Sequence, residues 1–179
     1  MARKTTYSSE VDQTYKVDKG RKRPKYRQGL YKPINPQKCI NCTDGKPIEF
    51  RSKLEFEYMH LMDKSDNVLS WGSETVWVPY VHPFKNRVAQ YWTDFIVNTR
   101  NHGILIIEIK PAKEIKVIHE NVRPKMTGRK KKSTFLYETK MFEINKAKWI
   151  AAQDFCKTKG WKFIQLSEKD LKDGKIPFL

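Results

Sequence analysis

Apolar and polar positions alternate most clearly between residues 74 and 110. In 74–81 an apolar side chain recurs at every second position, which predicts a strand with one buried face. Residues 91–97 predict a second strand, and a turn at 98–103 leads into 104–110. This third segment is almost wholly apolar and stops at Pro111, so we expect a central strand there.

Helical periodicity marks the segments on either side. Ser52 and Glu55 have the spacing of a capping box, which predicts that a helix begins there. A second helix is predicted to end at Gly160, since its apolar positions form one stripe. These positions are Ile144, Ala147, Ala151 and Phe155. With a last strand over 161–166, the order predicts a single compact α/β domain with a central mixed β-sheet flanked by helices.

Residues 1–48 lack this patterning. Eleven basic and three acidic residues fall between Met1 and Lys38, and apolar residues there are sparse and interrupted by prolines. Such a segment cannot bury enough surface to offset the entropy lost on ordering. We therefore expect a flexible basic N-terminal arm at 1–48 and a globular domain at 49–179.

The net charge of the whole chain limits the classes of binding partner. Lys and Arg number 36 against 20 Asp and Glu, for a net charge of +16 and a pI near 9.7. This balance favours nucleic acid, although a ribosome-like or merely soluble basic protein stays open on composition alone. No apolar run approaches the roughly 18 residues of a membrane span, and no secretory signal is visible. A cytoplasmic protein without membrane contact is expected.

The three cysteines give a weaker signal. Cys39 and Cys42 have the spacing of half a zinc site, but a zinc ribbon needs a second pair, and Cys156 stands alone. We interpret the pair as turn residues, while metal binding by them stays open.

Candidate chemistry lies at the end of the apolar segment 104–110. Glu108 and Lys110 project to the same side because strand side chains alternate, and hairpin pairing would bring Asp94 roughly opposite Glu108. Two close carboxylates repel each other unless a cation lies between them, and Mg²⁺ accepts such oxygen ligands. The alternative is a plain ion pair between Glu108 and Lys110 at a solvent-exposed strand end. Glu55 is also open to two interpretations, as a helix cap or as an acid directed toward the edge of the sheet.

These residues together resemble the PD-(D/E)XK nuclease superfamily, which has a Glu in an early helix, an Asp on a strand and Glu-x-Lys on the next. Residues 51–171 resemble its branch of TnsA-type transposon endonucleases and, within it, the head-completion nucleases of T-even-type tailed phages. Thr93 stands where the superfamily often has Pro. The matching segments are Arg51-Ser52-Lys53-Leu54-Glu55, Val68-Leu69-Ser70-Trp71-Gly72-Ser73-Glu74, Tyr91-Trp92-Thr93-Asp94-Phe95, Ile106-Ile107-Glu108-Ile109-Lys110-Pro111, Asn145-Lys146-Ala147-Lys148-Trp149 and Gly160-Trp161-Lys162-Phe163.

The resemblance implies a restriction-endonuclease-like core. Glu55, Asp94 and Glu108 would be the metal-site acids and Lys110 the catalytic lysine, with Mg²⁺, or Mn²⁺, as cofactor. It implies cleavage of DNA phosphodiester bonds with little base specificity during phage head completion, in the host cytoplasm or at the virion neck. Portal or neck proteins would be partners. A non-catalytic DNA- or portal-binding virion protein and a TnsA-like transposition endonuclease remain alternatives.

Basic residues outside the arm are candidates for phosphate contacts. A charge run is commonly only a solvated face, but beside a nuclease site we expect it to contact DNA. The candidates are Arg129, Lys130, Lys131, Lys132, Lys146 and Lys148.

Overall fold

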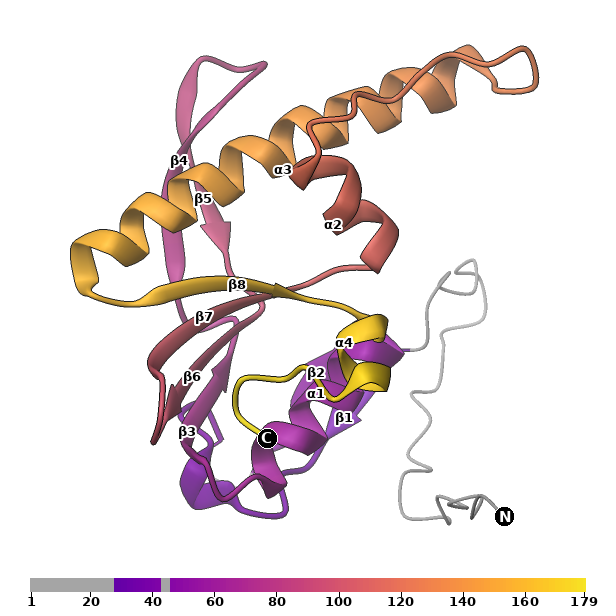
Figure 1. The fold of residues 1–179 in the computed structure, drawn as a ribbon. Coiled ribbons are helices and arrows are strands. Elements are labelled where there is room, and N and C mark those ends of the chain that lie inside the picture. The colour runs from indigo at the N-terminus through magenta and orange to yellow at the C-terminus, as the bar shows by residue number, and fades with distance from the viewer. Residues whose placement is uncertain (1–27, 43–45) are drawn as a thin grey trace, which may run out of the picture.

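The computed structural model describes residues 28–42 and 46–179 (Figure 1). Its centre is a four-stranded mixed sheet in the order β3-β6-β7-β8. β3 (Val68–Ser73), β6 (Phe95–Thr99) and β7 (Gly103–Ile109) run antiparallel, and β8 (Lys162–Leu166) pairs parallel to β7. The predicted α/β class with a mixed central sheet is confirmed, and the apolar segment at 104–110 forms an interior strand as expected.

Helices cover both faces of this sheet (Figure 1). α1 (Lys53–Lys64) and α4 (Glu168–Asp173) lie on one face, and the long α3 (Lys132–Lys159) lies across the other. α3 ends at Gly160, whose φ of 69° is the left-handed conformation that glycine adopts without a steric penalty. Its 28 residues span about 42 Å, so its first turns project beyond the sheet.

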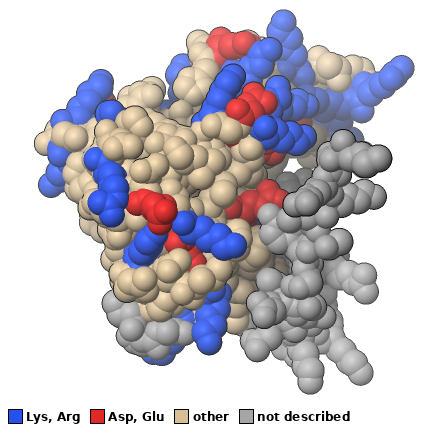
Figure 2. All heavy atoms as spheres, turned by 60° about the horizontal axis from the view of Figure 1, so that its bottom comes forward, with Lys and Arg blue, Asp and Glu red and all other residues tan. Residues whose placement is uncertain are grey.

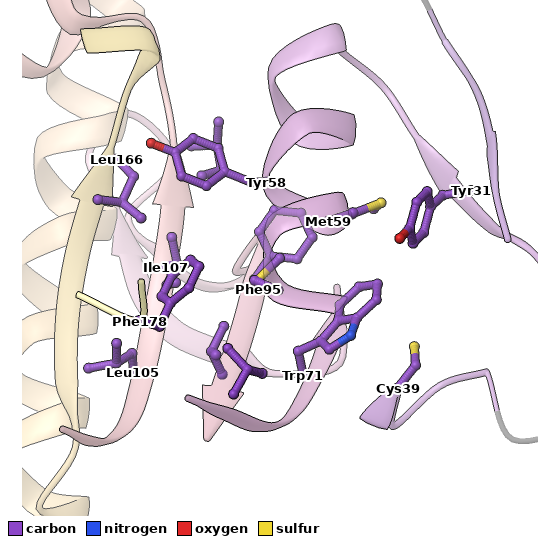
Figure 3. Close-up of a cluster of buried hydrophobic side chains, with 14 of the residues drawn as sticks. Tyr31, Cys39, Tyr58, Met59, Trp71, Phe95, Leu105, Ile107, Leu166 and Phe178 are labelled. Atoms are coloured by element: carbon purple, nitrogen blue, oxygen red, sulfur yellow. The ribbon is translucent and has the colours of Figure 1, made fainter. Parts of the chain in front are cut away.

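The main core lies between α1 and the sheet (Figure 3). It draws aromatic and aliphatic side chains from both termini of the described chain, including Tyr31 and the fully buried Phe178. Tyr58 also donates a hydrogen bond to the carbonyl of Ser167 at 2.8 Å, which ties α1 to the end of β8. Other members of this core are Cys39, Met59, Trp71, Phe95, Leu105, Ile107 and Leu166.

Regular structure is present before residue 49, within the range expected as a basic arm. β1 (Gly29–Tyr31) pairs with β2 (Ile48–Phe50), and a 3-10 turn at Pro36–Lys38 lies between them. The buried carboxylate of Asp63 in α1 holds this segment. It accepts hydrogen bonds from the Tyr31 hydroxyl at 2.7 Å and from the backbone N–H of Ile34 at 2.6 Å. The expected arm at 1–27 and residues 43–45 lie outside the described residues.

Cys39 and Cys42 are buried in this same N-terminal region. They were expected as turn residues, and the Cys42 N–H donates to the Cys39 carbonyl at 3.4 Å across such a turn. Both side chains also belong to the main core. Among the residues that the structure describes, no three His, Cys, Asp or Glu side chains are arranged as a complete metal site, at this pair or elsewhere.

The strands between β3 and β6 differ from the prediction. β4 (Trp77–His82) and β5 (Arg87–Trp92) form a separate two-stranded hairpin, which packs against α3 through Val78, Tyr80 and Tyr91. The segment 91–97, expected as one strand, is therefore divided at residues 93–94 between β5 and β6.

The polar stretch before the second helix also contains structure. α2 (Ala112–His119) follows Pro111, and α3 begins at Lys132 instead of near the apolar stripe. The first turns of α3 expose Leu136 and Tyr137, so the core-facing periodicity that predicts helices is absent there. None of the helices in the described ranges is long and apolar enough to cross a membrane.

Candidate active site

The break between β5 and β6 places Asp94 beside the end of β7. The last β6–β7 pair is Phe95 with Ile107, so Asp94 continues this register toward Glu108. One Asp94 carboxylate oxygen accepts a hydrogen bond of 2.6 Å from the backbone N–H of Ile109. The structure thus brings together two acids that have thirteen residues between them in the chain.

Glu108 is a nearly buried acid with two partners. Only 4% of its surface is exposed, and one carboxylate oxygen lies 2.7 Å from the Lys110 ammonium nitrogen. The other oxygen accepts a hydrogen bond from the Tyr91 hydroxyl. Tyr91 comes from the inner face of β5, and the sequence analysis gave it no role. The alternation of β5 could have indicated that Tyr91 faces inward. Its contact with Glu108 could not be predicted, because it depends on how the hairpin packs against the sheet.

The electrostatics of the group favour a bound positive charge. Burial, and next the charge of Glu108, raises the pKa of Asp94 from its ordinary 3.8 to about 8, against the lowering effect of Lys110. Burial lowers the pKa of Lys110, but Glu108 and Asp94 raise it more, so its pKa lies above the ordinary value. Lys110 therefore stays charged, but its charge does not return the pKa of Asp94 to the ordinary value.

Glu55 lies on α1, across a small hollow from Asp94. Its backbone N–H donates to the Ser52 hydroxyl at 3.1 Å, and its carboxylate accepts from the Arg51 N–H at 2.9 Å and from the Ser52 hydroxyl at 3.0 Å. It therefore caps α1 and also faces the site, as both interpretations of the sequence required. The hollow has a volume of about 30 Å³, enough for one water-sized occupant. Its lining residues are Glu49, Arg51, Glu55, Ser73, Glu74 and Asp94.

Arg51 and Glu74 form a two-pronged ion pair at this hollow. Their N–O distances are 2.7 and 2.9 Å. Glu74 has a φ of 50°, and its N–H donates to the Asp94 carbonyl at 3.0 Å. No pattern in the sequence singled out Glu49, Arg51 or Glu74 as site residues. Glu49 lies next to the boundary of the expected arm, and no spacing rule marked the other two.

A larger groove of about 450 Å³ lies between the hairpin and α3. Apolar side chains such as Val81, Val88 and Ile150 dominate its lining, with Asp154 as its one acid. Oxygen ligands for a hard cation are thus concentrated at the smaller hollow.

Comparisons with known proteins show the family of the chain. Residues 65–168 match the family model described as TnsA-like endonuclease N terminal. The chain is also 32% identical over 129 residues to the head completion nuclease of Enterobacteria phage T4, which covers 72% of this chain and 84% of that protein. The chain belongs to the TnsA-like endonuclease family. The predicted resemblance is confirmed.

The matched range of this TnsA-like endonuclease contains Asp94, Glu108 and Lys110. Glu55 precedes it, so the family match carries no information on that residue.

The donor set of the TnsA-like endonuclease fits a hard divalent cation. Mg²⁺ needs only one or two protein carboxylates, since water and phosphate oxygens fill its remaining positions. Asp94 and Glu108 supply two carboxylates whose mutual repulsion a cation would relieve. Glu55 would have to leave its capping contacts to serve as a third ligand.

The predicted DNA-contact residues fall into two groups in this TnsA-like endonuclease. Lys148 lies at the site: its ammonium nitrogen is 5.1 Å from the centroid of the Tyr91 ring and 5.9 Å from that of Tyr80. Burial lowers its pKa, Glu108 and Asp94 oppose this shift, and Lys110 adds to it. Lys146 is near α2, where it donates a 2.7 Å hydrogen bond to Asn121.

The run at 129–132 lies far from Lys148 along α3, where the helix begins. Figure 2 shows Lys and Arg side chains gathered toward this end of the molecule. Lys131 is the N-cap of α3, and no acidic residue occupies the first turn, so the positive end of the helix dipole adds to the basic charge. Lys130 differs from its neighbours because it forms an ion pair of 2.7 Å with Glu138.

Proposed function

We propose that this chain is a metal-dependent endonuclease that hydrolyses DNA phosphodiester bonds with little base specificity. The observation that carries the proposal is the close approach of Asp94 to the buried Glu108, beside Lys110, which together form a site of oxygen ligands next to a fixed positive charge. Asp94 and Glu108 hold Mg²⁺, or Mn²⁺ in its place, and Glu55 is the third acid of the site. When bound, the cation stabilises charge on the phosphate and lowers the pKa of a water that becomes the nucleophile.

Lys110 is the catalytic lysine of the proposal. Its raised pKa keeps the ammonium charged, so it stabilises the negative charge that develops on the phosphate oxygens. The hydrogen bond from Tyr91 holds the Glu108 carboxylate in place, which makes Tyr91 a positioning residue.

Lys148 is the DNA contact nearest to the reacting phosphate in this proposal, because it lies beside the Tyr91 ring at the site. Arg129, Lys130, Lys131, Lys132 and Lys146 contact phosphates farther along the duplex. Contacts of lysine and arginine to phosphate carry no sequence information, which is the basis for the low base specificity.

The name of the phage T4 relative extends the proposal to phage head completion. The protein would then act in the host cytoplasm or at the head–neck region of the virion, with portal or neck proteins as partners. A non-catalytic virion protein with a nuclease fold and a TnsA-like transposition endonuclease are the competing functions.

A cleavage assay tests the proposal. Linear, branched and single-stranded DNA are incubated with the full chain in Mg²⁺, Mn²⁺ or chelator, and products are resolved on a denaturing gel. We expect cleavage with either metal and none with chelator. Binding of all three substrates without any cleavage would favour the non-catalytic alternative.

A further inference from the structure

Two tryptophan side chains are exposed on the outer face of the β4–β5 hairpin. Trp77 and Trp92 are directly opposite each other in the register, and 44% and 49% of their surfaces are exposed. Tyr80 and Tyr91 on the inner face of the same hairpin are buried against α3. Tryptophan offers a large apolar surface that is ordinarily covered, so an exposed pair indicates a surface that a ligand covers.

The backbone ladder connects this pair to the acidic hollow. The Glu74 N–H donates to the Asp94 carbonyl, the Thr93 N–H donates to the Val76 carbonyl, and the Trp77–Trp92 pair follows. Trp92 stands two residues from Asp94, about 7 Å along an extended chain. That distance is the rise of about two nucleotides in a DNA strand.

The positive net charge of the hairpin favours binding of an anionic ligand. Residues 77–92 contain Lys85 and Arg87 and no acidic residue, although the chain as a whole has 20. Both basic residues are exposed at the hairpin tip, beyond the indole pair as seen from the hollow. A surface that offers aromatic faces between a metal-binding hollow and basic side chains matches single-stranded nucleic acid, which presents stacking bases and phosphates together.

We propose that Trp77 and Trp92 form a stacking platform for unpaired bases, so that the preferred substrate is DNA with single-stranded character next to the cleaved bond. This inference rests on the proposed function and specifies its substrate class. A continuous duplex keeps its base faces stacked inside the helix, whereas an end, a branch or a single strand exposes them to the indoles.

Equilibrium binding in chelator tests the platform without cleavage. The probes are a short oligothymidylate, the same phosphate backbone without bases, and a blunt duplex, each titrated into full-length protein. We expect Trp92→Leu to weaken oligothymidylate binding by roughly 5- to 100-fold, with Trp77→Leu in the same direction. Binding of the base-free backbone should stay within about twofold, because its phosphate contacts are unchanged.

Aromatic and positional controls separate stacking from general hydrophobic contact. Trp92→Phe keeps an aromatic face and should restore most of the affinity, while leucine keeps apolar area without one. Val88→Ala changes a side chain of β5 that is 70% exposed and lines the groove beside α3, four positions from Trp92, and should leave binding unchanged. A thermal melt of each variant confirms that the hairpin still folds.

Three results would overturn the platform. One is oligothymidylate affinity that survives Trp92→Leu, and another is an equal loss for the base-free backbone. The third is a change of solution mass in Trp92→Leu, which would show that a second copy of the chain covers the indoles. Failure of the proposed function is seen separately: the platform would still discriminate the probes, but no DNA would be cut in Mg²⁺ or Mn²⁺.

Discussion

The two faces of β7 differ in chemistry at the C-terminal end of the strand. Toward α1, Leu105, Ile107 and Ile109 are buried in the main core (Figure 3). Toward α3 and the hairpin, the same strand ends in the buried Glu108, and Lys110 follows on that side. Adjacent residues thus point into an apolar core and into an ionised cluster.

Neighbouring residues of β7 therefore contribute to different properties: those on the α1 face to the stability of the fold, and Glu108 on the other face to the proposed catalysis. Each aliphatic side chain on the α1 face stabilises the fold by roughly 1.5–3 kcal/mol through burial. A buried carboxylate has a desolvation cost that its partners must offset, and Asp94 lies close enough to Glu108 to add repulsion. Substitutions on the two faces should therefore affect different measurements.

The largest expected effect is on cleavage by variants of the acidic face. Asp94→Asn and Glu108→Gln should each lower the rate by about 10³-fold or more, because the metal contributes several kcal/mol of charge stabilisation. Asp94→Asn removes the repulsion between the two acids, so its melting temperature in chelator should hold or rise. Glu108→Gln also leaves the Lys110 ammonium without its ion-pair partner, so its melting temperature should fall. Cleavage rate and melting temperature are measured side by side. A lower melting temperature together with a normal cleavage rate would contradict the catalytic assignment of these acids.

Ile107→Ala is the matched control on the opposite face. It should lower the free energy of unfolding by about 2–5 kcal/mol, since Ile107 is 1% exposed. Cleavage per folded molecule should be retained. If this variant lost activity as completely as Glu108→Gln, the two faces would not be functionally separate.

A second prediction concerns Lys110 on the acidic face. Lys110→Met should lower cleavage by about 10²- to 10³-fold through loss of charge stabilisation at the phosphate. DNA affinity should change little, because one charge among 36 basic residues contributes little to the summed field. Lys113→Met, an exposed position on α2, should change neither quantity. A large loss of DNA affinity in Lys110→Met would show that this lysine serves binding.

The sequence predicted the arrangement of Asp94, Glu108 and Lys110 because it depends on local rules. Strand alternation and one hairpin are sufficient to place these three residues, and the structure brings them together. The capping box at Ser52 was equally local, and α1 begins there.

What the sequence did not predict depends on contacts between distant segments. Tyr91 reaches Glu108 only because α3 holds the hairpin against the sheet. The segment around Tyr31 has a composition typical of disorder, but it is anchored by Asp63, 32 residues away. No periodicity in the chain encodes such a pairing, so the contacts of this segment with α1 were not predicted.

A third prediction uses the pH dependence of stability without metal. The folded-state pKa of Asp94 is raised to about 8 from an ordinary 3.8, so its protonated form is favoured on folding. Its contribution to stability is therefore complete below about pH 4 and is lost as the pH rises through 8. Relative to Asp94→Asn, the melting temperature of the unmodified protein in chelator should fall over this window. Parallel curves for the two proteins would contradict the shift, and added Mg²⁺ should reduce the difference.

The smallest expected effect compares the two ends of α3. Lys131 is exposed where the helix begins, whereas Lys157 near the other end lies 3.3 Å from Asp154. If the 129–132 run contacts phosphates, Lys131→Ala should weaken duplex binding by a few-fold at low salt and reduce the slope of log affinity against log salt by about one. Lys157→Ala removes the same charge and should leave the slope unchanged.

Lys130→Ala should have a smaller effect than Lys131→Ala, because its ion pair with Glu138 competes with phosphate. Equal slopes for all three variants would place the DNA away from this end of α3 and leave Lys148 as the contact on that helix nearest the site.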